Sequence, residues 1–86
     1  MPRFIIERRF AKRVELDKAA ANEIAQINDE EGIRWLFSFL SADKFKSYCL
    51  YEAPNAEAIR IAAKRLNIPA DSIIEVGSEL RPEMFA

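Results

Sequence analysis

The order of β-rich and helical segments constrains the fold of this chain most strongly. Four segments rich in β-formers predict strands, at residues 3–8, 33–40, 44–52 and 72–77. Apolar residues at helical spacing predict one helix over residues 18–29 and a second between Asn55 and Asn67. Helices in both crossovers and a hairpin in the middle are typical of a split β-α-β pair. We therefore predict an α+β, ferredoxin-like βαββαβ sandwich, with a four-stranded antiparallel sheet and both helices on one face.

Turn and capping residues mark the ends of these segments. Asp17 and Asn55 are placed to accept hydrogen bonds at the starts of the two helices. Gly32 is suited to end the first helix in the left-handed conformation. Residues 41–43 form a link short enough for a hairpin, and Pro69 follows the second helix.

Composition limits the class of protein. The 86 residues suit one domain, residues 1–86, in which residues 79–86 are a C-terminal tail without clear periodicity. Charged residues are nearly balanced, with a net charge of -1, which argues against nucleic-acid or anionic-membrane partners. The single cysteine, Cys49, excludes an intrachain disulfide, and no apolar run is long enough for a membrane span. We expect a cytoplasmic protein.

The absence of histidine excludes much of the chemistry of enzyme sites. It removes the commonest general base near neutral pH, the Ser-His and Cys-His nucleophile pairs and the commonest transition-metal ligand. A single cysteine gives no structural zinc site, and two glycines give no phosphate-binding loop. We therefore predict no catalytic residue, no metal and no cofactor.

Both strands of the hairpin are apolar on both faces. Strict alternation puts Ile33, Trp35, Phe37 and Phe39 on one face of the first of them, and apolar residues also occur on the other face. Two helices cover only one face of a sheet, so the other would expose a large apolar patch. We predict a homodimer packed sheet to sheet, with the C-terminal tail wrapped onto the partner.

Two carboxylates lie within apolar strands and are candidates for a ligand site. Glu7 follows Ile6, and Glu75 lies between Ile74 and Val76. Their strands are neighbours in this topology, so we expect both side chains on the helix-free face, where a close pair would raise a pKa and bind a cation or move a proton. The alternative is that each pairs with an arginine at the sheet edge.

Aromatic residues complete the predicted ligand site. Trp35, Phe37 and Tyr51 line it in this interpretation, although core or interface packing is the alternative role for such side chains. Cys49, in an apolar strand, is expected to be a small buried hydrophobe. The basic run at residues 8–13 forms either an anion-binding loop or a solvated one.

Three segments carry a family resemblance: Phe4-Ile5-Ile6-Glu7-Arg8, Trp35-Leu36-Phe37-Ser38-Phe39-Leu40 and Tyr48-Cys49-Leu50-Tyr51-Glu52-Ala53-Pro54. Together with Asn67-Ile68-Pro69-Ala70, they resemble a family of short bacterial proteins of unknown function that includes a nickel-binding protein. The resemblance covers residues 3 to 77 and implies a ferredoxin-like, dimeric α/β barrel arrangement.

The departures from the family concern its metal ligands. Metal-binding relatives have histidine in the Trp-x-x-Ser segment and in the second helix, where this chain has Phe37 and Ala62. Nickel favours imidazole, so the resemblance does not bring metal binding with it. The first hypothesis is a dimeric, non-enzymatic protein that binds a small ligand or a protein partner. The alternatives are a divalent-metal protein with changed ligands and an isomerase-like enzyme with Glu7 or Glu75 as its base.

Overall fold

Strand β1 (Arg3–Arg9) lies inside a four-stranded sheet with the order β2-β3-β1-β4. The other strands are β2 (Arg34–Leu40), β3 (Lys46–Glu52) and β4 (Ser72–Val76), and all neighbouring strands are antiparallel. The structure, a computed structural model, describes residues 1–85. The strand order confirms the predicted antiparallel sheet.

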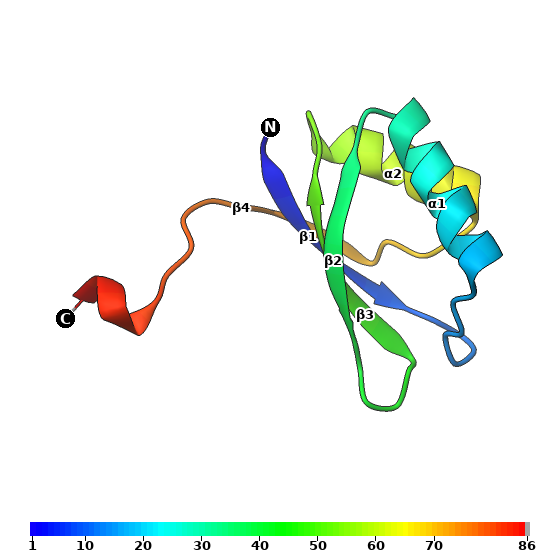
Figure 1. Ribbon diagram of the computed structural model, residues 1–86, viewed down its shortest axis with the longest axis horizontal. Coiled ribbons are helices and arrows are strands. Elements are labelled where there is room, and N and C mark those ends of the chain that lie inside the picture. The colour runs from blue at the N-terminus through cyan, green and yellow to red at the C-terminus, as the bar shows by residue number, and fades with distance from the viewer. Residues whose placement is uncertain (86) are drawn as a thin grey trace.

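Helices α1 (Lys18–Glu30) and α2 (Ala56–Leu66) lie on the same side of the sheet (Figure 1). The predicted caps are present, because the Asp17 and Asn55 carboxyl and amide oxygens accept hydrogen bonds from the backbone N–H groups three residues further on, at 2.8 and 2.9 Å. Gly32 has a φ of +71°, the left-handed conformation that follows the end of α1. The arrangement is the predicted ferredoxin-like sandwich.

The core lies between the sheet and the helices. It is formed by alternate residues of the two central strands and by the inner face of α2, and its members include Phe4, Ile6, Cys49, Tyr51, Ile59 and Ala62. Ile6 is fully buried, and Cys49 is 5% exposed, which confirms its predicted place as a small buried side chain.

Strand β2 departs from the predicted alternation. Trp35 pairs with Tyr51 and Phe37 pairs with Leu50, so β2 advances by two residues where β3 advances by one. This bulge reverses the side-chain direction beyond Trp35. Phe37 therefore lies on the helix-free face and Ser38 on the helix side, and the prediction that Phe37 shares a face with Trp35 was wrong.

The hairpin turn is longer than the sequence indicated. Lys44 has a φ of +68°, and the Asp43 carboxylate accepts hydrogen bonds from the Phe45 backbone N–H at 3.0 Å and the Ser41 hydroxyl at 2.7 Å. These hydrogen bonds hold the pKa of Asp43 below its ordinary value. Strand β3 consequently begins at Lys46 and not at residue 44.

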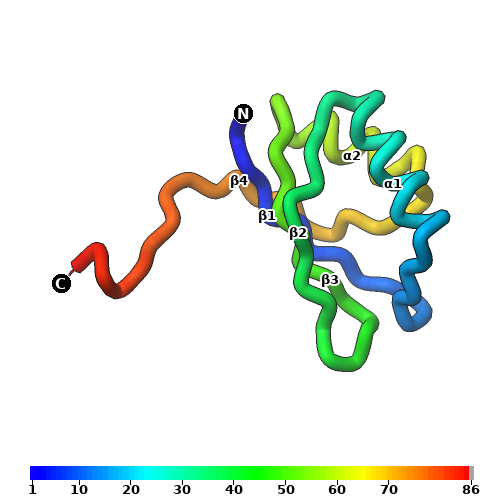
Figure 2. The backbone as a smooth tube through the Cα atoms, in the orientation of Figure 1, coloured from blue at the N-terminus to red at the C-terminus, as the bar shows by residue number. Residues whose placement is uncertain are grey.

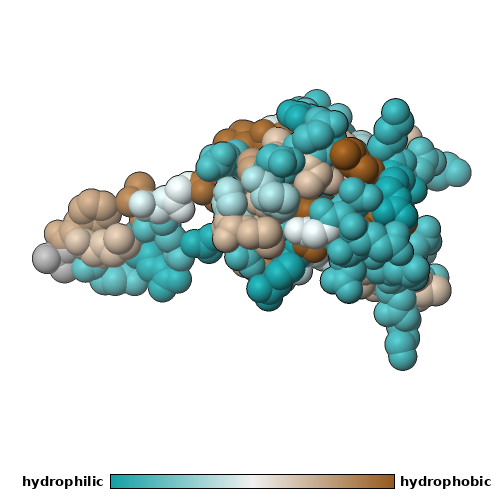
Figure 3. All heavy atoms as spheres, turned by 90° about the horizontal axis from the view of Figure 1, so that it is seen from above, coloured by the Kyte–Doolittle hydropathy of each residue, from teal (hydrophilic) through white to brown (hydrophobic). Residues whose placement is uncertain are grey.

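The C-terminal segment leaves the sheet after β4 and projects away from the body, as the tube in Figure 2 shows. It ends in the short 3₁₀ helix η1 (Pro82–Phe85), where Phe85 is 74% exposed. Seen from above, the apolar atoms of this tail stand apart from the rest of the molecule (Figure 3). Within residues 1–85 there is no helix of the length and hydropathy needed to cross a membrane.

Candidate functional site

A cavity of about 1070 Å³ lies between the helix side of the sheet, α1, the β1–α1 loop and the loop after α2. It exists because small residues face each other across it: Ser38, Ser47 and Cys49 on the strands, and Ala20 on the first turn of α1. The one buried residue of α1 is Asn28, near the end of the helix. The first turns of α1 therefore stand off the sheet and leave a space that opens to solvent.

Trp35 and Tyr51 form one wall of this cavity. They lie opposite each other on β2 and β3, and the Trp35 indole N–H donates a hydrogen bond to the Ser38 hydroxyl at 2.7 Å. This bond fixes the indole plane against the sheet. The predicted pocket lay on the helix-free face, between the sheet and a partner, and that location was wrong, because Trp35 and Tyr51 face the helices. Tyr51 is part of the core and Trp35 packs against it, which is the packing role given as the alternative. Ligand binding by this pair stays a prediction.

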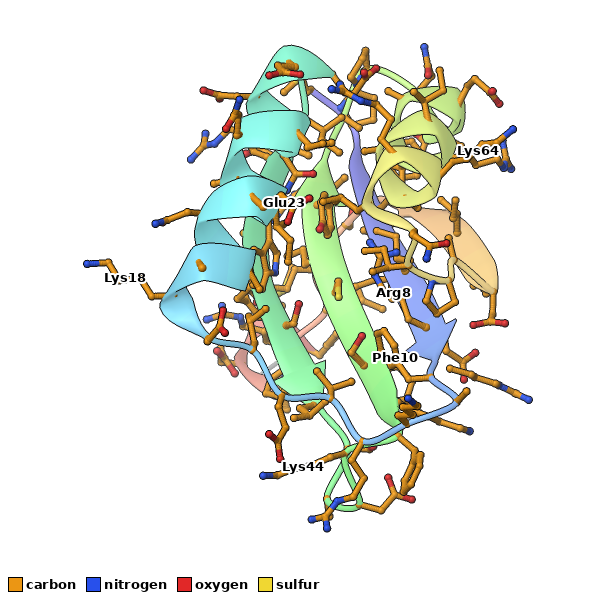
Figure 4. All side chains as sticks on the ribbon, turned by 90° about the vertical axis from the view of Figure 1, so that its right-hand side faces the viewer. Arg8, Phe10, Lys18, Glu23, Lys44 and Lys64 are labelled. Carbon is orange, nitrogen blue, oxygen red and sulfur yellow. The ribbon has the colours of Figure 1, made fainter. Side chains whose placement is uncertain are left out.

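Arg8 lies at the floor of the cavity, 4% exposed. Its Nη1 donates a hydrogen bond to the Pro69 carbonyl at 2.7 Å, and its Cζ lies 5.7 Å from the centroid of the Tyr51 ring. In Figure 4 it lies on β1, below the end of α2. Burial raises the pKa of Tyr51, and the positive charge of Arg8 opposes that rise. Tyr51 is therefore a neutral hydroxyl at physiological pH.

Sequence reasoning placed Arg8 in a basic run and missed its role as a pocket residue. The signal was available, because Phe4, Ile6 and Arg8 alternate on one strand and so share a face. A charged residue that occupies the same alternating positions as buried apolar residues has its side chain on the core side of the strand.

The mouth of the cavity is rich in positive charge. Five basic residues and two acidic ones line the cavity: Arg8, Arg9, Lys12, Arg13, Lys64, Glu15 and Glu23. Most of them come from the basic run and from the loop that carries it to α1. Figure 4 shows Glu23 on the edge of α1 beside this space. The run is thus part of the pocket, and anion binding by it stays a prediction.

Glu7 and Glu75 do not share a face, which corrects the predicted carboxylate pair. Glu7 lies opposite Ser72, whereas Glu75 lies opposite Phe4, three residues back along β1. An odd separation places the two side chains on opposite faces. Glu7 is on the helix-free face, 3.9 Å from Arg9 Nε and 3.8 Å from Lys46 Nζ, so the alternative of basic partners holds for Glu7.

These positions also argue against the isomerase hypothesis, in which Glu7 or Glu75 acts as the base in the cleft between sheet and helices. Neither Glu7 nor Glu75 lines the cavity between sheet and helices. Of the five residues predicted to form one ligand site, only Trp35 and Tyr51 are brought together there.

The helix-free face carries an apolar row that crosses all four strands. The register aligns Phe37 with Leu50, Leu50 with Ile5, and Ile5 with Ile74. Phe39 extends the row, with its ring centroid 5.7 Å from that of Phe37 in an edge-to-face contact. Phe37, Phe39 and Ile74 are each more than half exposed.

The fold and the cavity define a small ferredoxin-like α+β domain with a pocket under its first helix. The chain belongs to the family described as nickel responsive protein SCO4226-like, whose model matches residues 4–76. A solved structure, that of SCO4226 from Streptomyces coelicolor A3(2), is similar to this chain with a TM-score of 0.77 and 24% sequence identity. The match covers 91% of this chain and 99% of that one, and it shows a shared fold. No curated protein matches significantly.

The nickel in the family's description calls for a test of the ligands that this chain offers. Residues 1–85 contain no group of three or more His, Cys, Asp or Glu side chains that could hold a metal ion. The sequence has no histidine, and Cys49 is buried in the core. Nickel sites in proteins rely on imidazole or thiolate donors. The residues present therefore do not fit a nickel site.

Proposed function

We propose that this protein binds a small organic molecule in the cavity between the sheet and α1. The observation that carries the proposal is the cavity itself, whose volume of about 1070 Å³ is just above the usual range for small-molecule sites. Its walls combine apolar surface from Trp35, Ile24 and Leu66 with a few polar groups at fixed positions. That combination is typical of ligand pockets, in which polar groups set orientation.

The shape of the pocket favours a planar apolar body. Trp35 offers an indole face held by its hydrogen bond to Ser38, and the facing Ala20 leaves room above it. A well-packed core does not keep such a space between a helix and a sheet. A ligand that fills it would stabilise the folded state by mass action.

Indole is a suitable first probe, and a variant in which a new side chain fills the pocket tests whether indole binds there. Ala20→Phe places a ring in the cavity, while Ala19→Phe makes the same change one residue away at an exposed position of α1. We expect indole to raise the melting temperature of the native protein and of Ala19→Phe, and to leave Ala20→Phe unchanged. Equal shifts in both variants would place indole elsewhere, and no shift in any protein would remove the support for a pocket ligand.

We further propose that the helix-free face pairs with a second copy of the chain. The apolar row of Phe37, Leu50, Ile5 and Ile74 is flanked by charges, since Arg34 lies opposite Glu52 and Glu52 opposite Arg3. An apolar centre with a charged rim is the usual composition of a protein interface. A two-fold axis through the row would cover it with the same row.

In this dimer the C-terminal tail packs on the partner. Leu80, Met84 and Phe85 are each more than half exposed, on a segment that points away from its own sheet. Exposed apolar side chains on such an arm favour burial against another chain. The dimer would thus leave the pocket, on the other side of the sheet, free for its ligand.

A further inference from the structure

Arg8 is a buried cation without a counter-charge. Among residues 1–85, no carboxylate lies within 4.0 Å of its guanidinium, and its hydrogen-bond acceptor is the Pro69 carbonyl. A guanidinium has five N–H donors, so most of them have no acceptor among residues 1–85. Charged side chains are seldom buried to this degree without a partner, because desolvation of the charge is costly.

The pattern of the other basic residues sharpens this point. Five of the seven other arginines have carboxylate partners: Arg9 with Glu7, Arg34 with Glu52, Arg60 with Glu57, Arg65 with Glu30 and Glu31, and Arg81 with Glu79. Within residues 1–85, Arg3, Arg8 and Arg13 form no such pair; Arg3 and Arg13 are exposed to solvent, whereas Arg8 is buried. Arg8 lines the cavity, so a molecule bound there lies beside this residue.

Neutral hydrogen-bond donors surround the same part of the cavity. The Tyr51 ring lies beside the guanidinium, and Ser38 and Ser47 line the strand wall. Because the Trp35 indole donates to the Ser38 oxygen, the Ser38 O–H is available to donate in turn. Lys12, Arg13 and Lys64 add positive charge at the mouth, against the carboxylates of Glu15 and Glu23.

We infer that the ligand of this pocket is a small organic anion, whose carboxylate pairs with Arg8 while its apolar body lies against Trp35. The inference rests on the proposed function and adds the chemical class of the ligand. An arginine fork donates two parallel hydrogen bonds to a carboxylate, and the low exposure of the site strengthens such a pair.

A matched pair of probes tests the inference by calorimetry. Indole-3-acetate and indole-3-acetamide have the same size and ring and differ in charge. We expect the native protein to bind the acetate at least about tenfold more tightly, the scale of one charge-assisted hydrogen bond. Arg8→Met should lose this preference, and Arg3→Met, on the same strand but at an exposed position, should keep it. Arg8→Lys, which retains the charge without the fork, should keep only part of it and covers the case in which the methionine variant does not fold.

The outcomes separate the two claims. Equal affinity of the native protein for acetate and acetamide overturns the anion inference and leaves the pocket as a binding site. A preference that survives both Arg8→Met and Arg8→Lys also overturns it, because the basic residues at the mouth would then be responsible. Binding of neither probe counts against both the inference and the proposed function.

Discussion

The guanidinium of Arg8 lies over the ring of Tyr51, with 5.7 Å between Cζ and the ring centroid. Both side chains are almost fully buried, on neighbouring strands of the sheet. The aromatic face gives the cation a partial electrostatic partner, worth about 2 kcal/mol when the pair is desolvated. Of the guanidinium N–H groups, one at Nη1 donates to the Pro69 carbonyl, and the others remain available to a ligand. This contact joins the core of the fold to the floor of the cavity.

The first prediction concerns the ionisation of Tyr51. Burial raises its pKa, so in a Tyr48→Phe variant, where Tyr51 is the one remaining tyrosine, the phenolate absorbance should appear above the ordinary value of about 10. Adding Arg8→Met should raise the pKa further, because the positive charge of Arg8 favours the phenolate. A pKa that falls on removal of Arg8 would contradict the observed contact.

The same shift predicts a pH dependence of stability. The unfolded chain releases the Tyr51 proton near pH 10, whereas the folded chain retains it to higher pH. The folded state binds the extra proton in that interval, so this contribution is complete below pH 10 and is lost as pH rises towards the folded-state pKa. Denaturant unfolding at a series of alkaline pH values should show a shallower decline for Tyr51→Phe than for the native protein.

The next prediction concerns dimerisation through the helix-free face. Phe39→Glu puts a charge beside the apolar row and should convert a dimer into a monomer in sedimentation at micromolar concentration. Ile61→Glu is the matched control, because Ile61 is an exposed apolar residue of α2, away from this face. Native protein with the mass of a single chain would refute the dimer.

The core and the helix-free face should respond differently to the same truncation. Ile6→Ala removes a fully buried side chain and should lower the free energy of unfolding by about 2–5 kcal/mol. Ile74→Ala, 58% exposed in one chain, should cost much less at concentrations where the chains are separate. Urea unfolding at low and high protein concentration measures both, and the Ile74→Ala loss should grow with concentration if the partner buries that residue.

Nickel binding has a direct test. Protein purified without an affinity tag and dialysed after exposure to nickel should retain far less than one metal ion per chain, because the described residues offer no cluster of metal ligands. The measurement is elemental analysis. Stoichiometric retention would show that this chain binds nickel through donors other than those of a conventional site.

Sequence patterns predicted the fold well because local signals agreed with one another. Asp17, Gly32 and Asn55 mark helix ends by their own chemistry, and the segment order leaves few topologies. The bulge at Leu36 was not predictable, because it depends on the pairing with β3 and not on the composition of β2. Every residue after it, Phe37 included, was therefore assigned to the wrong face.

The candidate site was only partly predictable for a related reason. Trp35 and Tyr51 were identified as aromatic residues on adjacent strands, but the cavity beside them depends on small residues from two elements. No sequence pattern marks Ser38, Ser47 or Ala20 as a site residue. They face one another only in the folded structure, where α1 lies over the sheet. The prediction that Glu7 and Glu75 share a face was wrong, because residues on adjacent strands share a face only if the strand register aligns them.

The central claim, that the cavity under α1 is a binding site, is tested most directly by nitrogen–proton NMR during titration with indole. The chain has one tryptophan, so a single indole N–H resonance reports on the cavity wall. The account predicts that this resonance shifts together with the amides of Ser47, Cys49 and Ala20, while those of Phe39 and Ile74 stay in place. Shifts confined to Phe39, Ile74 and their neighbours, with the Trp35 resonance unchanged, would contradict it.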